Sequence, residues 1–152
     1  MVEFYPAKQV VPRIWVGSMQ DASSSDFMDQ HRVGLIINCT KDVPAFFAGT
    51  IPTYRVPMDD HETSAPVLYG HAPTVAREMR RFLERTPGSI LVHCAAGISR
   101  SSSMVASYLI LEHDATVIES IRRIRGRKPE TFQPRVVFVS ALVRFQQERR
   151  AR

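Results

Sequence analysis

The sequence predicts an α/β fold in which a central, mostly parallel sheet of about four to five strands is flanked by helices. Short apolar runs rich in β-branched residues recur along the chain between turn-forming residues, as strands do. Stretches with a helical period lie between and after these runs. Strands that are apolar along their whole length and separated by helices indicate a parallel sheet covered on both faces.

In the first two thirds of the chain, four runs are expected as strands: Ile14–Val16, Val33–Ile37, Tyr54–Val56 and Ser89–Val92. A short helix is expected over Ser25–Gln30. A longer amphipathic helix is predicted before Pro87 and Gly88, because apolar residues recur there at helical spacing: Val75, Met79, Phe82 and Leu83.

The last third of the chain is expected to be helical. Ser101–Leu111 is nearly all apolar or small, and Thr116 is placed to cap a helix over Val117–Arg125. A final helix is predicted from Pro134 to about Arg150, because proline is tolerated at the first helical position.

Length and composition predict one soluble domain over residues 1–152. We also expect it to act as a monomer. Lys and Arg number 20 against 15 for Asp and Glu, a net charge of +5 that favours anionic partners. The start lacks the layout of a signal peptide and no apolar run is long enough for a membrane span, so we expect a cytoplasmic protein, with the nucleus left open. Two cysteines are too few for a disulfide framework, and no further Cys or His ligands accompany them at the spacing of a zinc site.

The sharpest motif joins the end of the last predicted strand to an apolar helix. A loop in this place directs several backbone N–H groups and the positive end of a helix dipole into one concavity, which suits phosphate. The run reads His93-Cys94-Ala95-Ala96-Gly97-Ile98-Ser99-Arg100-Ser101, and its substrate-binding positions would be Ala95, Ala96, Gly97, Ile98, Ser99 and Arg100.

The residue types in this loop point to nucleophilic chemistry. The loop and Arg100 would stabilise a Cys94 thiolate placed for in-line attack on phosphorus, giving a phosphocysteine that water hydrolyses. Arg100 can offer a planar fork to two phosphate oxygens. Ser101 is expected to donate a hydrogen bond to the leaving sulfur, and His93 to orient the loop. No cofactor or metal is expected.

The run from His93 to Ser101 matches the signature of the cysteine-dependent protein tyrosine phosphatases. The residues between its cysteine and its arginine resemble those of the dual-specificity branch. The resemblance covers most of residues 10–147, including Ile14–Ser18, Ile36–Lys41 and Arg127–Pro129. One stretch departs from the pattern: many members carry an Asn-x-Gly-Phe turn before the last helix, where this chain reads Glu130-Thr-Phe-Gln-Pro134.

The resemblance implies a general acid on a loop after a predicted strand. The family position falls on Asp60 in Val56-Pro-Met-Asp-Asp60, and Asp59 is the second candidate. Expelling an alkoxide or phenoxide requires such a proton donor.

Cys39 has two interpretations. It is either a small residue of a core strand or, by resemblance to related phosphatases, the redox partner that forms a disulfide with Cys94.

Within the family, the resemblance implies a phosphatase acting on phosphotyrosine and phosphoserine or phosphothreonine in proteins. The loop lacks the lysines that resemblance associates with phosphoinositide phosphatases, although that activity, an RNA 5′-phosphatase and a module that binds phosphorylated partners without turnover all stay open. Because aromatics do not interleave with the basic runs, nucleic acid is not favoured as a partner.

Overall fold

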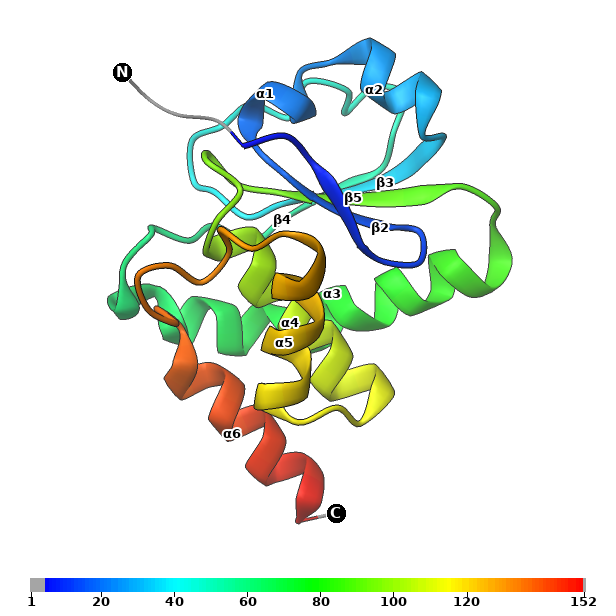
Figure 1. The fold of residues 1–152 in the computed structure, drawn as a ribbon. Coiled ribbons are helices and arrows are strands. Elements are labelled where there is room, and N and C mark those ends of the chain that lie inside the picture. Colours follow the sequence, from blue (N-terminus) through cyan, green and yellow to red (C-terminus); the bar gives the residue numbers. More distant parts are fainter. Residues whose placement is uncertain (1–4, 152) are drawn as a thin grey trace.

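The computed structural model describes residues 5–151 and contains one five-stranded sheet (Figure 1). The spatial order is β1-β2-β5-β3-β4. Strands β2, β5, β3 and β4 run parallel, and β1 pairs with β2 antiparallel at one edge. The predicted α/β class is therefore confirmed. The strands are β1 (Lys8–Val11), β2 (Ile14–Gly17), β3 (Val33–Asn38), β4 (Thr53–Arg55) and β5 (Ser89–His93).

Helices cover both faces of the sheet. The short helices lie on one face of the sheet and the longer helices on the other (Figure 1). The short pair is α1 (Met19–Ala22) and α2 (Ser25–Gln30). The remainder are α3 (Ala65–Arg85), which follows the 3-10 turn η1 (Glu62–Ser64), then α4 (Arg100–His113), α5 (Val117–Arg127) and α6 (Val139–Arg150).

Alternation along the strands divides the core between these two layers. In β3 and β5, Ile36 and Leu91 pack with Met28 under the short helices. Their neighbours Ile37 and Val92 point to the other face and join the larger core under the long helices. Burial on both faces explains why the central strands are continuously apolar.

Helix α4 is the central helix of the larger layer. Its residues from Ser101 to Ile110 are buried, and it contacts α3, α5 and α6. The helix begins at Arg100, a short loop after β5 ends at His93, so its N-terminus follows the carboxyl end of a central strand.

The cap at Thr116 is present as expected. Its side chain accepts a hydrogen bond from the Glu119 N–H at 3.0 Å, and the Thr116 N–H donates to the Glu119 carboxylate at 2.8 Å. This reciprocal capping satisfies two N–H groups that a helix start leaves unpaired.

The predicted start of the last helix at Pro134 was wrong, because α6 begins at Val139. Residues 131–138 form turns and bends instead of a helix, and Phe132 there adopts a φ of 62°. Tertiary contacts hold this segment: the Phe132 N–H donates to the Ile98 carbonyl, and the Phe138 side chain is fully buried. The edge strand β1 and helix α1 are additional to the predicted elements.

Across residues 5–151, no helix combines the length and apolar character needed to cross a membrane.

Candidate active site

The candidate site is the loop Cys94–Ser99 between β5 and α4, with His93 at the end of β5 and Arg100 and Ser101 in the first turn of α4. Gly97 has a φ of 80°, a conformation that favours glycine. A Cβ atom there would also lie 3.0 Å from backbone atoms of Gly17. The loop therefore curves tightly against β2 and leads into the N-terminus of α4, which favours an anion.

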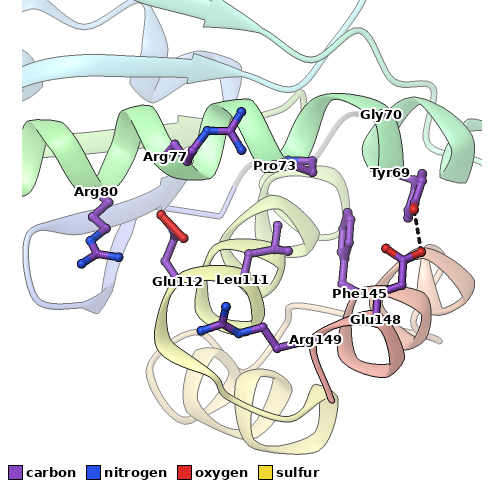
Figure 2. A pocket seen from close by; sticks show the side chains of 10 residues that line it. All are labelled: Tyr69, Gly70, Pro73, Arg77, Arg80, Leu111, Glu112, Phe145, Glu148 and Arg149. Atoms are coloured by element: carbon purple, nitrogen blue, oxygen red, sulfur yellow. Dashed lines mark hydrogen bonds between the residues drawn. The ribbon is translucent and has the colours of Figure 1, made fainter. Parts of the chain in front are cut away.

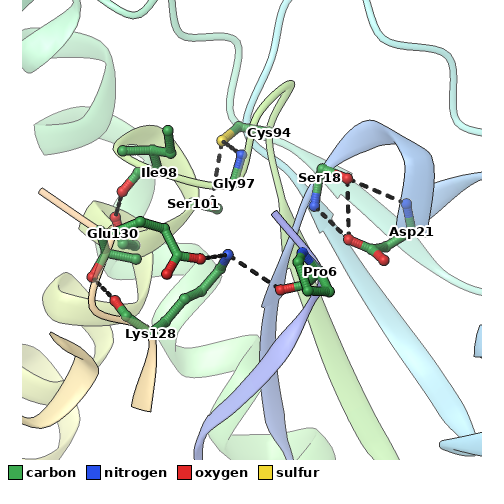
Figure 3. A network of polar contacts seen from close by, with 11 residues as sticks. Pro6, Ser18, Asp21, Cys94, Gly97, Ile98, Ser101, Lys128 and Glu130 are labelled. Atoms are coloured by element: carbon green, nitrogen blue, oxygen red, sulfur yellow. Dashed lines mark hydrogen bonds and ion pairs between the residues drawn. The ribbon is translucent and has the colours of Figure 1, made fainter. Parts of the chain in front are cut away.

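Cys94 lies inside this curve and is only 2% exposed. Its Sγ atom accepts a hydrogen bond from the Gly97 N–H at 3.3 Å and lies 3.2 Å from Ser101 Oγ (Figure 3). The structure thus brings together Cys94, Gly97 and Ser101 as the sequence predicts. Both contacts stabilise negative charge on sulfur when the serine hydroxyl donates.

Arg100 joins the loop to the segment that carries the candidate acids. Its Nη1 atom donates to the Met58 carbonyl at 3.0 Å. Its Nε atom is buried and has no hydrogen-bond partner among the described residues. A buried N–H without a partner is costly, so this atom is a donor that a bound oxyanion would satisfy.

His93 is buried at the end of β5, and its Nδ1 atom lies 3.3 Å from the Cys94 carbonyl oxygen. Burial is the main cause that lowers the pKa of His93 to about 4; the nearby charges of Arg55 and Arg100 lower it further, while the contact with the Cys94 carbonyl raises it. The ring is therefore neutral near pH 7. Its remaining ring N–H can position the loop backbone, but the neutral ring does not act as a general acid.

The turn after β2 holds the other side of the loop, and the sequence reasoning did not assign it a role. The Met19 N–H donates to the Ala95 carbonyl at 3.0 Å, and the Cys94 N–H donates to the Gly17 carbonyl at 3.3 Å. Ser18 and Asp21 fix the turn through a capping box (Figure 3). The Ser-x-x-Asp spacing is the sequence signal that points to this turn.

A second support comes from the stretch that departs from the family pattern. Lys128 is fully buried, and its Nζ atom contacts Glu130 at 2.7 Å and the Pro6 carbonyl at 3.3 Å (Figure 3). The Phe132 N–H then donates to the Ile98 carbonyl at 3.2 Å. Contact with the phosphate loop is therefore made here without an Asn-x-Gly-Phe turn.

The two candidate acids differ in their surroundings. The Asp59 carboxylate forms an ion pair with Lys41 Nζ at 2.7 Å. Asp60 is exposed, and no hydrogen bond or ion pair joins its carboxylate to another described residue. The segment lies next to the loop through the bond from Arg100 to Met58.

Cys39 follows β3 as Cys94 follows β5. Asn38 and His93 are register partners, and the Cys39 N–H donates to the His93 carbonyl at 2.8 Å. Both thiols are buried, free and part of the same core cluster. Burial raises the pKa of the Cys39 thiol, negative charge on Cys94 raises it further, and Arg100 opposes these effects. Cys39 is therefore a thiol in the resting protein.

A groove of about 610 Å³ lies elsewhere, between α3, α4 and α6 (Figure 2). It includes Leu111 and Glu112 in the last turn of α4, whereas the loop precedes the first turn. A helix of 14 residues spans roughly 21 Å. This groove is thus separate from the candidate site.

Comparison with known proteins agrees with the geometry. Human Dual specificity protein phosphatase 14 is 28% identical over 140 residues, which cover 92% of this chain and 69% of the relative. Rat Dual specificity protein phosphatase 26 is 28% identical over 126 residues, covering 80% of this chain and 59% of that protein. The crystal structure of human DUSP28 superposes with a TM-score of 0.85 at 22% identity, covering 95% of both chains, and so supports the fold.

The family comparison covers the sheet, the loop and the helical layer together. Residues 14–148 match the family described as "Dual specificity phosphatase, catalytic domain". This chain therefore belongs to the dual specificity phosphatase catalytic domain family.

Proposed function

We propose that this chain hydrolyses phosphate monoesters of tyrosine, serine and threonine in proteins, with Cys94 as the nucleophile. The Cys94 thiolate attacks phosphorus, an S–P bond forms and the P–O bond to the substrate breaks. Asp60 gives its proton to the leaving oxygen. Water then attacks the phosphocysteine, Asp60 accepts a proton from it, and inorganic phosphate leaves as the thiolate is restored.

The observation that carries this proposal is a buried sulfur at the start of the loop together with a buried, unsatisfied guanidinium atom at its end. Cys94 Sγ is held by the Gly97 N–H and by Ser101, and Arg100 Nε has no partner among the described residues. A phosphate group above the sulfur would accept from that Nε atom and from the loop N–H groups, including those of Ala95, Ala96, Ile98 and Ser99. Charge-assisted bonds of this kind strengthen as charge develops on the phosphoryl oxygens.

The surroundings of the two acids support Asp60 over Asp59 as the proton donor. Asp59 is held by Lys41, and its backbone N–H donates to Ser64 Oγ at 3.0 Å. Asp60 has no competing partner among the described residues and is free to approach a leaving group.

We assign supporting roles to Ser101 and His93. Ser101 Oγ, at 3.2 Å from the sulfur, donates a hydrogen bond as the thiolate departs. His93 is a positioning residue that acts through the Cys94 carbonyl.

A protein substrate is favoured by the loop itself. Its variable positions, Ala95, Ala96, Ile98 and Ser99, carry no charge to meet the extra phosphates of a phosphoinositide. We further expect the chain to act as a monomer, which sedimentation equilibrium would check.

The direct test is hydrolysis of a small aryl phosphate in the presence of a chelator. We expect no turnover by Cys94→Ser and a loss of roughly a hundredfold in kcat for Asp60→Ala. Asp59→Ala is the matched control and should lose much less. Activity that survives Cys94→Ser would refute the mechanism.

A panel of phosphopeptides, phosphoinositides and 5′-phosphorylated RNA then tests the substrate class. Release of phosphate from RNA or lipid but not from phosphopeptides would reject the protein substrate. Tight binding of phosphopeptides without any turnover would instead identify a binding module.

We also propose Cys39 as a redox partner of Cys94. The two residues follow register partners on adjacent strands, which are spaced about 4.8 Å apart, and disulfides need Cα atoms roughly 4.4 to 6.8 Å apart. Peroxide would oxidise the Cys94 thiolate to a sulfenic acid, and the Cys39 sulfur would then attack it, forming the S–S bond and releasing water.

The redox proposal is tested by recovery after peroxide treatment. Wild-type protein should regain activity on addition of a thiol, whereas Cys39→Ser should be inactivated irreversibly at the same dose. Equal recovery by both proteins would refute the pairing.

A further inference from the structure

A groove beside the phosphate loop has no role in the chemistry described above. It has a volume of about 520 Å³ and lies between α1 and the loop that follows β3. We propose that it binds a large apolar side chain of the phosphoprotein substrate, next to the phosphorylated residue. This inference rests on the proposed function and adds a sequence preference to it.

The groove is continuous with the loop that would hold the phosphate. One of its lining residues is Ala95, which directly follows Cys94. On the α1 side, the Met19 N–H donates to the Ala95 carbonyl at 3.0 Å. A peptide whose phosphate reaches Cys94 therefore places a neighbouring side chain at this groove.

The groove presents apolar side chains to solvent. Met19 is 38% exposed and Phe46 is 48% exposed, and both belong to the small set of large apolar residues left uncovered at the described surface. Val43 and Pro44 continue the apolar lining. Such a surface gains most by contact with an aliphatic or aromatic side chain.

The loop that carries Phe46 is fixed at its base by buried polar groups. Asn38 Nδ2 donates to the Val43 carbonyl at 2.8 Å, and Thr40 Oγ1 donates to Asn38 Oδ1 at 2.7 Å. Arg55 Nη2 also donates to the Val43 carbonyl, at 2.9 Å. A wall that is ordered before binding loses little conformational entropy when substrate arrives.

The charge of the groove further restricts which substrate side chains it can bind. Asp42 is the one charged residue among the described residues that line the groove. The preceding Lys41 is engaged by Asp59, so it does not neutralise the groove. An acidic residue at the same substrate position is therefore disfavoured, because like charges repel.

The groove between α3, α4 and α6 in Figure 2 is not a candidate for binding this substrate side chain. Two of the arginines that line it are paired with carboxylates, Arg80 with Glu84 at 2.7 Å and Arg149 with Asp114 at 3.5 Å. It also lies at the far end of α4 from the loop.

The test uses peptides that carry one phosphotyrosine in an alanine and serine background. Phenylalanine is placed in turn at each of the three positions on either side. For wild-type protein we expect one placement to raise kcat/KM roughly tenfold over the peptide with alanine there, and glutamate at that position to lower it. The quantity compared among variants is this ratio of phenylalanine to alanine peptide.

Phe46→Ala and Met19→Ala should each bring the ratio towards one. The matched control is Ile118→Ala on α5, which removes an apolar side chain that is 61% exposed and distant from the groove, and it should keep the wild-type ratio. A wild-type ratio near one at all placements, or a ratio that both groove variants preserve, would overturn the groove while leaving aryl phosphate hydrolysis intact. Failure of wild-type protein to hydrolyse aryl phosphate would overturn the proposed function and this inference with it.

Discussion

The buried imidazole of His93 makes the stability of this protein depend on pH. Burial lowers its pKa from 6.5 to about 4 in the folded protein. Between these two values the unfolded chain holds a proton on His93 that the folded chain lacks. The free energy of unfolding therefore rises with pH across this window. The contribution of His93 is present above about pH 6.5 and is lost as pH falls from about 6.5 towards about 4.

The two pKa values set the size of the effect. With 6.5 for the unfolded chain and about 4 for the folded one, His93 lowers the free energy of unfolding by about 2 kcal/mol between pH 7 and pH 5. The full difference, approached near pH 4, is about 3 kcal/mol. Other groups that titrate in this range contribute equally to wild-type protein and to a variant that lacks His93.

The assay is urea unfolding of wild-type protein and His93→Asn at pH 7 and pH 5. The variant is expected to be less stable at pH 7, because it loses a buried ring, but to lose about 2 kcal/mol less than wild-type protein on acidification. His71→Asn, which replaces an exposed imidazole on α3, controls for loss of a histidine as such. Equal losses for wild-type protein and His93→Asn would refute the assignment of the effect to His93.

Three further changes test other parts of the structure. Gly97→Ala should cost about 1 to 2 kcal/mol of stability, because φ is 80° there, and should lower kcat/KM for aryl phosphate; thermal unfolding and kinetics that both match wild type would contradict this. Lys128→Met should destabilise by about 2 kcal/mol, because it leaves a partly buried Glu130 without its cation. Lys128→Met combined with Glu130→Gln should recover part of that loss in urea unfolding, and no recovery would count against the ion pair. Thr116→Ala should cost about 1 kcal/mol by calorimetry through loss of the α5 cap, and an unchanged midpoint would exclude that role.

Local sequence signals predicted most of the fold because they coincide with tertiary demands. The apolar strands and the capped helices at Ser25 and Val117 lie where expected. The start of the last helix was missed because proline fixes only its own φ. The contact of Phe132 with the phosphate loop lies far from it in sequence, and no helix-start signal reports it.

In the candidate site, too, local sequence predicted some features and tertiary contacts decided the others. The loop from His93 to Ser101 is contiguous, so its chemistry was readable in one motif. The Met58 carbonyl that meets Arg100 and the Gly17 carbonyl that meets Cys94 are backbone groups, which any residue type would supply. In the sequence Lys128 ends a basic run that also holds Arg122, Arg123, Arg125 and Arg127, and only its burial distinguishes it from those exposed arginines.

The hydrogen bond from Arg100 to Met58 has a thermodynamic consequence for the proposed reaction. One guanidinium would hold the phosphate with one part of its fork and the acid-bearing segment with another. Oxyanion binding and closure of that segment are then linked equilibria, and each strengthens the other by the same factor. Cleavage within residues 59–63, or an antibody that pulls this segment outward, would therefore weaken the binding of product phosphate. Neither change would touch the phosphate site itself.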